Sequence, residues 1–359
     1  MNEHAYAVIL AGGKGERFWP LSRTGRPKQV LRLFGGRPLL AMAVDRVREL
    51  VPPARVFVIT SRDLAEVTRE AAPELPPGNV IGEPFGRDTA AACALGMALV
   101  RERDPAGVFC VVTADHLIPE TAIFVETMRD GLSKAAAEDV LITIGIPPRF
   151  ASTGYGYIET GSPVGRIGNT EFFEALRFVE KPDRATAEEY LQSGRFFWNS
   201  GMFVWSVKSL RDALAKHCPP VAAMADAVSQ AGAVAREETI AREYEKLDRV
   251  SIDYALMEKA GNLVTIRGVF QWGDVGAWSS LAEHFPADEA GNVTLGECSA
   301  LDAGGNIVVS EGRLTALLGV EDLVVVQSEN ATLVCHKDRA QDVKQLVRML
   351  SECGRNEYL

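Results

Sequence analysis

The part of the sequence best suited to chemistry is a glycine-rich loop that carries two cations. Three glycines follow the apolar run of residues 5–11: Gly12, Gly13 and Gly15. Glycines directly after a buried strand let backbone N–H groups approach phosphate oxygens closely. Arg17 and Lys28 lie in the same loop, and two fixed cations beside such an anion site suit a polyphosphate. The loop therefore predicts a polyphosphate-binding site.

The spacing of these glycines argues against two common phosphate-binding loops. It is not Gly-x-Gly-x-x-Gly, so the dinucleotide-binding fold of a dehydrogenase is not indicated. It is also not Gly-x-x-x-x-Gly-Lys-Ser/Thr, so the loop is not a P-loop. The phosphate-binding loop must belong to another class.

Two aspartates are candidate metal ligands. Asp115 directly follows the apolar run 108–113, at the edge where open α/β sheets bind ligands. Asp274 lies in a turn flanked by glycines. Two carboxylates together with phosphates and water suit Mg²⁺. From spacing alone, a helix N-cap for Asp115 and a turn residue for Asp274 are the simpler interpretations.

The composition excludes several functional classes. The 359 residues include 38 Lys+Arg and 48 Asp+Glu, a net charge of −10, which argues against a binder of polynucleotides. The longest apolar stretch, 90–100, is shorter than the roughly 20 residues of a membrane helix. The N-terminus lacks a basic region before an apolar one, so we expect no secretory signal. Six scattered cysteines indicate reduced thiols, which favours a cytoplasmic location.

The order of apolar segments predicts two domains. Residues 1–285 alternate strand-like and helix-like segments, which indicates a mostly parallel sheet covered on both faces. Residues 286–359 carry short strands at close spacing and a final amphipathic helix at 338–350. This small β unit is too short to bury its own core well. The apolar stripe of its helix needs a partner surface, either on this chain or on a second one.

The glycine-rich loop and its continuation resemble a known family signature. The segment Gly12-Gly13-x-Gly15-x-Arg17, with Pro20-Leu21-Ser22 and then Pro27-Lys28, resembles that of the sugar nucleotidyltransferases. Its Phe18-Trp19 and Pro27-Lys28-Gln29 look like the bacterial mannose-1-phosphate guanylyltransferase family. Further blocks follow in the family's order: Glu83–Ala91, Ala114–His116, Phe178–Pro182, Trp198–Phe203, Ser251–Tyr254 and Trp272–Trp278.

The resemblance implies both the fold and the activity. We expect a Rossmann-like nucleotidyltransferase domain with a mixed, mostly parallel sheet, followed by a small C-terminal unit like a left-handed β-helix. The implied reaction transfers GMP from GTP to mannose 1-phosphate with Mg²⁺, giving GDP-mannose and pyrophosphate. Relatives of this short form imply a homodimer that the tail supports. Bifunctional relatives carry an additional isomerase domain, and we expect none in this sequence.

The resemblance also assigns roles to individual residues. Arg17 and Lys28 are implied as catalytic cations, and Asp115 and Asp274 as metal ligands. The implied nucleotide-binding residues are Gly12, Gly13, Gly15, Glu83, Pro84, Arg87, Asp88 and Thr89. The implied sugar-phosphate-binding residues are Gly154, Tyr155, Glu180, Lys181 and Asn199. Helix capping is the simpler interpretation of Asp88 and Thr89, and core packing that of Trp198 and Phe203.

This chemistry needs no general base, because a sugar 1-phosphate is already anionic near neutral pH. Positioning and charge neutralisation are then the main catalytic requirements. We also expect the phosphate loop to be mobile and to contribute little to the core.

Alternative functions remain at this point. One is a nucleotidyltransferase for glucose 1-phosphate or a related sugar 1-phosphate, or for another nucleotide. A remote one is a non-catalytic regulatory subunit that senses sugar nucleotides. Such a subunit would be expected to lose its phosphate cations or metal carboxylates, yet Arg17, Lys28, Asp115 and Asp274 are all present.

Overall fold

The computed structural model describes residues 3–359, which form two compact units. The first unit contains the residues up to 12 together with 43–114 and 118–272. The second contains 13–42, 115–117 and 273–359. The sequence predicts a single division of the chain at residue 285, whereas these units are defined by their contacts and each contains several segments. The glycine-rich loop therefore packs with the C-terminal part of the chain.

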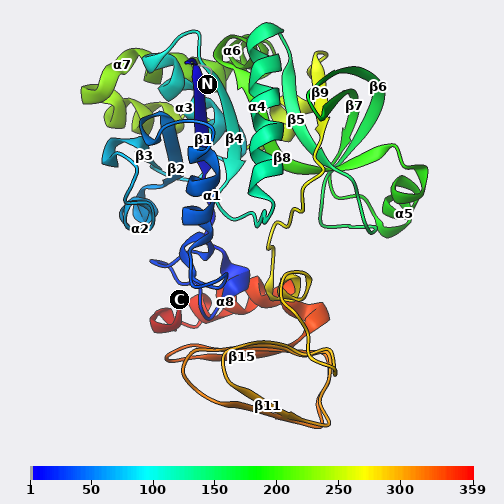
Figure 1. The fold of residues 1–359 in the computed structure, drawn as a ribbon. Helices are drawn as coiled ribbons and strands as arrows, with labels where there is room; N and C mark the ends of the chain where they lie inside the picture. Colours follow the sequence, from blue (N-terminus) through cyan, green and yellow to red (C-terminus); the bar gives the residue numbers. More distant parts are fainter. Residues whose placement is uncertain (1–2) are drawn as a thin grey trace. The chain divides into compact units, whose positions relative to one another are not determined.

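The first unit is built on a nine-stranded mixed sheet with the order β3-β2-β1-β4-β8-β5-β9-β7-β6 (Figure 1). Strands β3, β2, β1 and β4 are parallel neighbours, whereas β8 runs antiparallel between β4 and β5. The expected mixed sheet is thereby confirmed. The strands are β1 (Ala5–Leu10), β2 (Val56–Ser61), β3 (Val80–Glu83), β4 (Val108–Thr113), β5 (Leu141–Ile146), β6 (Tyr157–Ile167), β7 (Thr170–Val179), β8 (Phe196–Ser206) and β9 (Leu263–Arg267).

Helices cover both faces of this sheet, because its central strands are apolar on both sides. In β8, Phe203 and Trp205 join the core formed with α3, α6 and α7. Val204 points to the other face, where a Cβ added to Gly131 of α4 would lie 3.2 Å from its side chain. The helices are α1 (Leu39–Arg48), α2 (Ala65–Ala71), α3 (Thr89–Arg103), α4 (Thr121–Ala137), α5 (Arg184–Ser193), α6 (Val207–His217) and α7 (Pro219–Tyr244).

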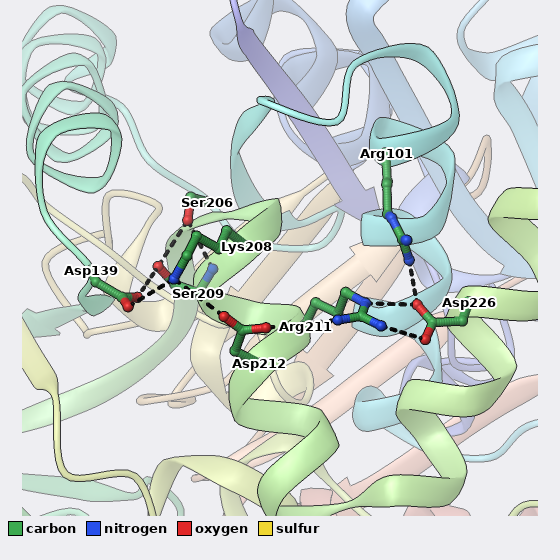
Figure 2. A network of polar contacts seen from close by, with 8 residues as sticks. All are labelled: Arg101, Asp139, Ser206, Lys208, Ser209, Arg211, Asp212 and Asp226. Atoms are coloured by element: carbon green, nitrogen blue, oxygen red, sulfur yellow. Dashed lines mark hydrogen bonds and ion pairs between the residues drawn. The ribbon is translucent and has the colours of Figure 1, made fainter.

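A polar network ties α3, α6 and α7 together (Figure 2). Arg211 of α6 donates from Nε and Nη2 to the two carboxylate oxygens of Asp226 in α7, each at 2.9 Å. Arg101 of α3 binds the same carboxylate. Ser206 caps α6 by accepting the backbone N–H of Ser209 at 2.9 Å. The network ties α6 to α3 and α7 through a single carboxylate, that of Asp226.

The second unit contains a β-helix-like stack of short strands (Figure 1). Parallel pairs link β10 to β12, β12 to β14 and β11 to β13. Two buried asparagines, Asn292 and Asn306, occupy equivalent turns, and Asn306 Nδ2 donates to Asn292 Oδ1 at 2.9 Å. The elements are β10 (Val293–Leu295), β11 (Cys298–Leu301), β12 (Ile307–Ser310), β13 (Thr315–Leu318), β14 (Leu323–Gln327), β15 (Thr332–His336) and α8 (Val343–Glu352).

The glycine-rich segment shares a hydrophobic core with this stack. Phe18 and Leu31 are buried in one cluster with Trp278 and Val343. The expectation that the loop contributes little to the core is therefore wrong, because its large apolar side chains are buried away from water in the core of the second unit. The same cluster covers the apolar stripe of α8, so this helix finds its partner surface on its own chain.

Two stretches of the first unit depart from regular geometry. Strand β6 lies within the segment 149–169, and its pairing with β7 shifts register near Gly161, Pro163 and Gly165. These residues weaken the strand pattern in the sequence. Residues Asp253–Met257 form a π-helical turn. No helix among residues 3–359 is long and apolar enough to cross a membrane.

The packing of α8 yields a testable prediction. Val343 is 3% exposed, whereas Met349 on the same helix is 49% exposed. Replacing Val343 with Ala should lower the free energy of unfolding by about 1–3 kcal/mol, because it removes buried methyl groups and leaves a cavity. Urea denaturation measures this, and Met349→Ala is the matched control. Equal stability of the two variants would contradict the packing role of α8.

Candidate active site

The cation Lys28 joins three segments of the second unit. Its Nζ lies 2.9 Å from Asp115 Oδ2. It also donates to the backbone carbonyls of Asp274 at 3.0 Å and Val275 at 2.5 Å. Only 7% of Lys28 is exposed, so these partners replace most of its water. Lys28 is therefore not a solvated surface lysine, and its ammonium group contacts the carboxylate of Asp115 and the backbone of Asp274, the two expected metal ligands.

Glycine is required where the loop passes this lysine. Gly15 has a φ of +65°, and an added Cβ would lie 2.3 Å from Lys28 Cβ. Its carbonyl accepts hydrogen bonds from Phe18 N and Ser22 Oγ, which turns the chain and sets Arg17 in place. Arg17 Nε is buried and has no hydrogen-bond partner among the described residues. An unsatisfied guanidinium donor beside a glycine-rich loop suits an anionic ligand.

Asp115 is held in its ionised form. Burial by itself would raise the pKa of its carboxyl, but the Lys28 ammonium and His116 lower the pKa below its usual range. The following helix α4 begins at Thr121 after Glu120, so the interpretation of Asp115 as a helix N-cap is wrong. The Asp274 carboxylate folds back over its own turn, where a Cβ on Gly276 would lie 3.1 Å from Oδ2.

These donors fit a magnesium ion that takes its other ligands from a substrate. Mg²⁺ is commonly held by one or two carboxylates, with phosphate oxygens and waters filling the remaining positions. Asp115 and Asp274 supply two carboxylates, and both residues contact Lys28. Within residues 3–359, no group of three or more His, Cys, Asp or Glu side chains forms a metal site. The fit therefore depends on a ligand that brings its own oxygens.

In the first unit, the expected base-reading residue Glu83 lies at the end of β3. It is 7% exposed, and its Oε1 accepts a hydrogen bond from the Tyr244 hydroxyl at 3.0 Å. Burial raises the pKa of Glu83 to about 7; the Tyr244 hydrogen bond lowers the pKa, and the charge of Asp88 raises it. Such a carboxyl changes its charge near neutral pH.

The residues that follow Glu83 and Pro84 in this block form hydrogen bonds with other parts of the protein. Arg87 Nε donates to the Tyr244 carbonyl at 2.9 Å. Asp88 accepts the N–H of Thr89 at 2.8 Å and caps α3, as its simpler interpretation requires. Thr89 Oγ1 accepts the N–H of Ile252 at 2.9 Å. These contacts shape the wall around Glu83, and the role of the block in nucleotide binding stays a prediction.

The expected sugar-binding residues Glu180 and Asn199 meet beside Gly156. A Cβ on Gly156 would lie 2.6 Å from Glu180 Oε2 and 3.4 Å from Asn199 Cβ. The N–H of Asn199 donates to the Gly156 carbonyl at 2.8 Å. Lys181, with a φ of +46°, places its Nζ 2.5 Å from Glu180 Oε1. The first unit thus brings together two polar groups and a cation that suit a phosphorylated sugar.

Three aromatic rings pack together around Tyr155. The ring of Tyr155 lies 5.1 Å from Trp198 and 5.1 Å from Trp272. Gly154 N donates to Ser152 Oγ at 3.2 Å, which shapes the turn before Tyr155. Trp198 is buried in the core, as expected for it.

Sequence reasoning missed the partners behind these groups. The hydroxyl of Tyr244 supports Glu83 from 161 residues away, and no local pattern marks it. Asp253 accepts a hydrogen bond from Asn199 Nδ2 at 2.8 Å. Its place in the Ser251–Tyr254 block is the signal that could have found it.

The structure groups the predicted residues by unit. The first unit carries Gly12, the Glu83–Thr89 block and the sugar-binding group. The second carries Gly13, Gly15, Arg17, Lys28, Asp115 and Asp274. Anion-binding loop, cations and carboxylates with an α/β sheet define the class: an enzyme that handles nucleotide phosphates.

Comparison with known proteins identifies the family. The nucleotidyl transferase family model matches residues 6–291, and a MannoseP isomerase/GMP-like beta-helix domain matches residues 296–350. This chain therefore belongs to the nucleotidyl transferase family, as its motifs predicted.

Individual relatives match nearly the whole chain. A Klebsiella pneumoniae protein named mannose-1-phosphate guanylyltransferase is 37% identical over 98% of this chain and 75% of its own length. One from Escherichia coli O157:H7, named mannose-1-phosphate guanylyltransferase 2, is 36% identical over the same shares. A crystal structure from Thermus thermophilus, described as a mannose-1-phosphate geranyltransferase, has a TM-score of 0.86 and 36% identity over 97% of this chain and 99% of that one.

The raised pKa of Glu83 predicts a pH-dependent stability. The folded state holds this proton up to about pH 7, whereas the unfolded carboxyl loses it near 4.5, so stability falls as pH rises between these values. Replacing Glu83 with Gln removes the titration. Relative to the wild type, the variant should gain up to about 3 kcal/mol between about pH 5 and pH 8.

Denaturant unfolding at both pH values measures this gain. Glu66→Gln, on a side chain that is 77% exposed, is the control and should show no such gain. A constant difference between Glu83→Gln and the wild type at both pH values would contradict the assignment.

Proposed function

We propose that this chain transfers GMP from GTP to α-D-mannose 1-phosphate, giving GDP-mannose and pyrophosphate. The observation that carries the proposal is the match over 98% of the chain to proteins named mannose-1-phosphate guanylyltransferase. The chain spans about three quarters of the length of those relatives. The reaction requires cations and carboxylates, and Arg17, Lys28, Asp115 and Asp274 supply these groups; Lys28 Nζ contacts the Asp115 carboxylate and the Asp274 backbone carbonyl.

The reaction is a single displacement at phosphorus. A phosphate oxygen of the sugar 1-phosphate forms a bond to the α-phosphorus of GTP, and the bond from that phosphorus to the bridging β-oxygen breaks. Pyrophosphate leaves with the electron pair. The nucleophile carries its negative charge already, so no side chain has to remove a proton. Catalysis then depends on bringing two anions together and stabilising the added charge.

The cations of the glycine-rich loop answer that requirement. Arg17, with its unpartnered Nε, supplies a planar donor for the triphosphate. Lys28 supplies a buried positive charge whose partners already fix its position. Asp115 and Asp274 would hold a Mg²⁺ ion, and such an ion neutralises phosphate charge when bound. The depressed pKa of Asp115 keeps that ligand ionised.

The first unit supplies recognition of the base and the sugar. An ionised Glu83 accepts hydrogen bonds from the N1–H and N2–H₂ edge of guanine, and adenine lacks this edge. Lys181 attracts the sugar phosphate, while Glu180 and Asn199 bind hydroxyl groups. We propose a homodimer in the cytoplasm for the assembled enzyme. The exposed pair Leu301 and Leu318, opposite each other on β11 and β13, supports a subunit contact.

Substrate specificity tests the proposed function. Pyrophosphate release is measured with each of the four nucleoside triphosphates against mannose 1-phosphate and glucose 1-phosphate, in the presence of Mg²⁺. GTP with mannose 1-phosphate should give the highest kcat/KM, and the reverse reaction should also run. A higher kcat/KM with UTP or ATP would overturn the guanylyl assignment.

The metal ligands give a separate prediction. Asp115→Asn and Asp274→Asn each remove one formal charge with little change of shape, so both should lower kcat/KM by a factor of about 10² and raise the Mg²⁺ concentration for half-activity. A Mg²⁺ titration of the initial rate measures this, with thermal unfolding as the check on folding. The exposed Asp139→Asn is the control. A wild-type Mg²⁺ titration for Asp115→Asn would refute its role as a ligand.

A further inference from the structure

One short segment of the first unit contacts both the base-reading block and the sugar-binding group. Val250 N donates to the Arg87 carbonyl, and the Val250 carbonyl accepts from Ala90 N, each at 3.3 Å. Two residues on, Ile252 N donates to Thr89 Oγ1 at 2.9 Å. The next residue, Asp253, then binds Asn199. The segment 250–253 is therefore anchored on one recognition block and ends on a residue of the other.

The hydrogen bonds of Asn199 show what this contact does. A side-chain amide has two N–H donors and an oxygen that accepts twice. One donor goes to Asp253 Oδ1 at 2.8 Å, and the oxygen accepts the N–H of Gly201 at 3.1 Å. One donor and one acceptor position remain for a ligand. A carboxylate only accepts hydrogen bonds, so Asp253 binds the Asn199 amide through its NH₂ group. This fixes which side of the amide presents the remaining N–H donor.

The position of Asp253 is costly for an ionised carboxyl. Burial raises its pKa to about 6; the Asn199 hydrogen bond lowers the pKa, and the nearby charges of Glu180 and Glu258 raise it. The carboxyl sits at the start of a π-helical turn, a distortion that often occurs at functional sites. Asp253 therefore disfavours folding at neutral pH while it orders a neighbouring recognition group.

We propose that Asp253 is a positioning residue for sugar recognition, acting through the amide of Asn199. The inference rests on the proposed function and deepens its sugar side. Asp253 orients the amide so that its free N–H and its oxygen meet complementary groups of the sugar. Its anchoring through Ile252 and Val250 holds the carboxylate at a set distance from the Glu83–Thr89 block.

The test compares Asp253→Asn with the wild type in steady-state assays with GTP and mannose 1-phosphate. Asp253→Asn replaces the charged acceptor by an amide, which leaves the Gly201 N–H alone to reject the flipped orientation of Asn199, so KM for mannose 1-phosphate should rise about 10-fold or more. KM for GTP and kcat should stay within about threefold, and the melting temperature at neutral pH should equal or exceed that of the wild type. Asp248→Asn, an exposed neighbour in the chain, is the matched control.

A double-mutant cycle separates positioning from a merely structural role. If Asp253 acts through Asn199, adding Asp253→Asn to Asn199→Ala should change KM for mannose 1-phosphate by less than about twofold. Additive effects, an unchanged KM in Asp253→Asn, or a loss of stability with both KM values raised would each overturn the inference. An inactive wild type would instead refute the proposed function.

Discussion

The second unit depends on one buried ammonium group. Lys28 Nζ contacts Asp115 and the carbonyls of Asp274 and Val275, so a single charge gathers three segments that are far apart in the sequence. A charge removed from water is costly unless it is paired and hydrogen-bonded, and each of these partners reduces that cost. The same arrangement sets a cation beside two candidate metal ligands. Folding of this unit and the charge distribution needed for phosphate transfer are therefore one requirement.

The residues of the first unit that we propose for recognition are also structural parts. Asp88 caps α3, and Thr89 Oγ1 accepts a hydrogen bond from the backbone of Ile252. Arg87 donates a hydrogen bond to the last carbonyl of α7. A residue with two tasks leaves little freedom in the position of its backbone. These hydrogen bonds restrict the backbone of the segment that follows Glu83. That segment joins the start of α3 to the end of α7.

Two carboxyls in this unit are kept where they disfavour the folded state. Glu83 and Asp253 both have pKa values raised by burial, to about 7 and about 6. Each accepts a hydrogen bond from one well-placed donor, Tyr244 and Asn199 respectively. Acidic groups of this kind reduce stability at neutral pH. In the proposed function, Glu83 would accept hydrogen bonds from the base and Asp253 would orient Asn199 toward the sugar, so function and stability would conflict at these two positions.

The sequence alone determined the family and the α/β class, because glycine spacing, strand runs and short motifs are local. Through its resemblance to the family signature it also named Lys28 and Asp115, which lie 2.9 Å apart in the structure, and their roles stay predictions. Only the tertiary structure decided that the loop belongs to a hydrophobic core, and that Tyr244 and Asp253 stand behind the recognition residues. Glu83 and Tyr244 are 161 positions apart in the sequence, and the core joins Phe18 to Trp278. A single sequence carries no signal for such pairs, since burial and hydrogen bonding across that distance exist only once the chain has folded.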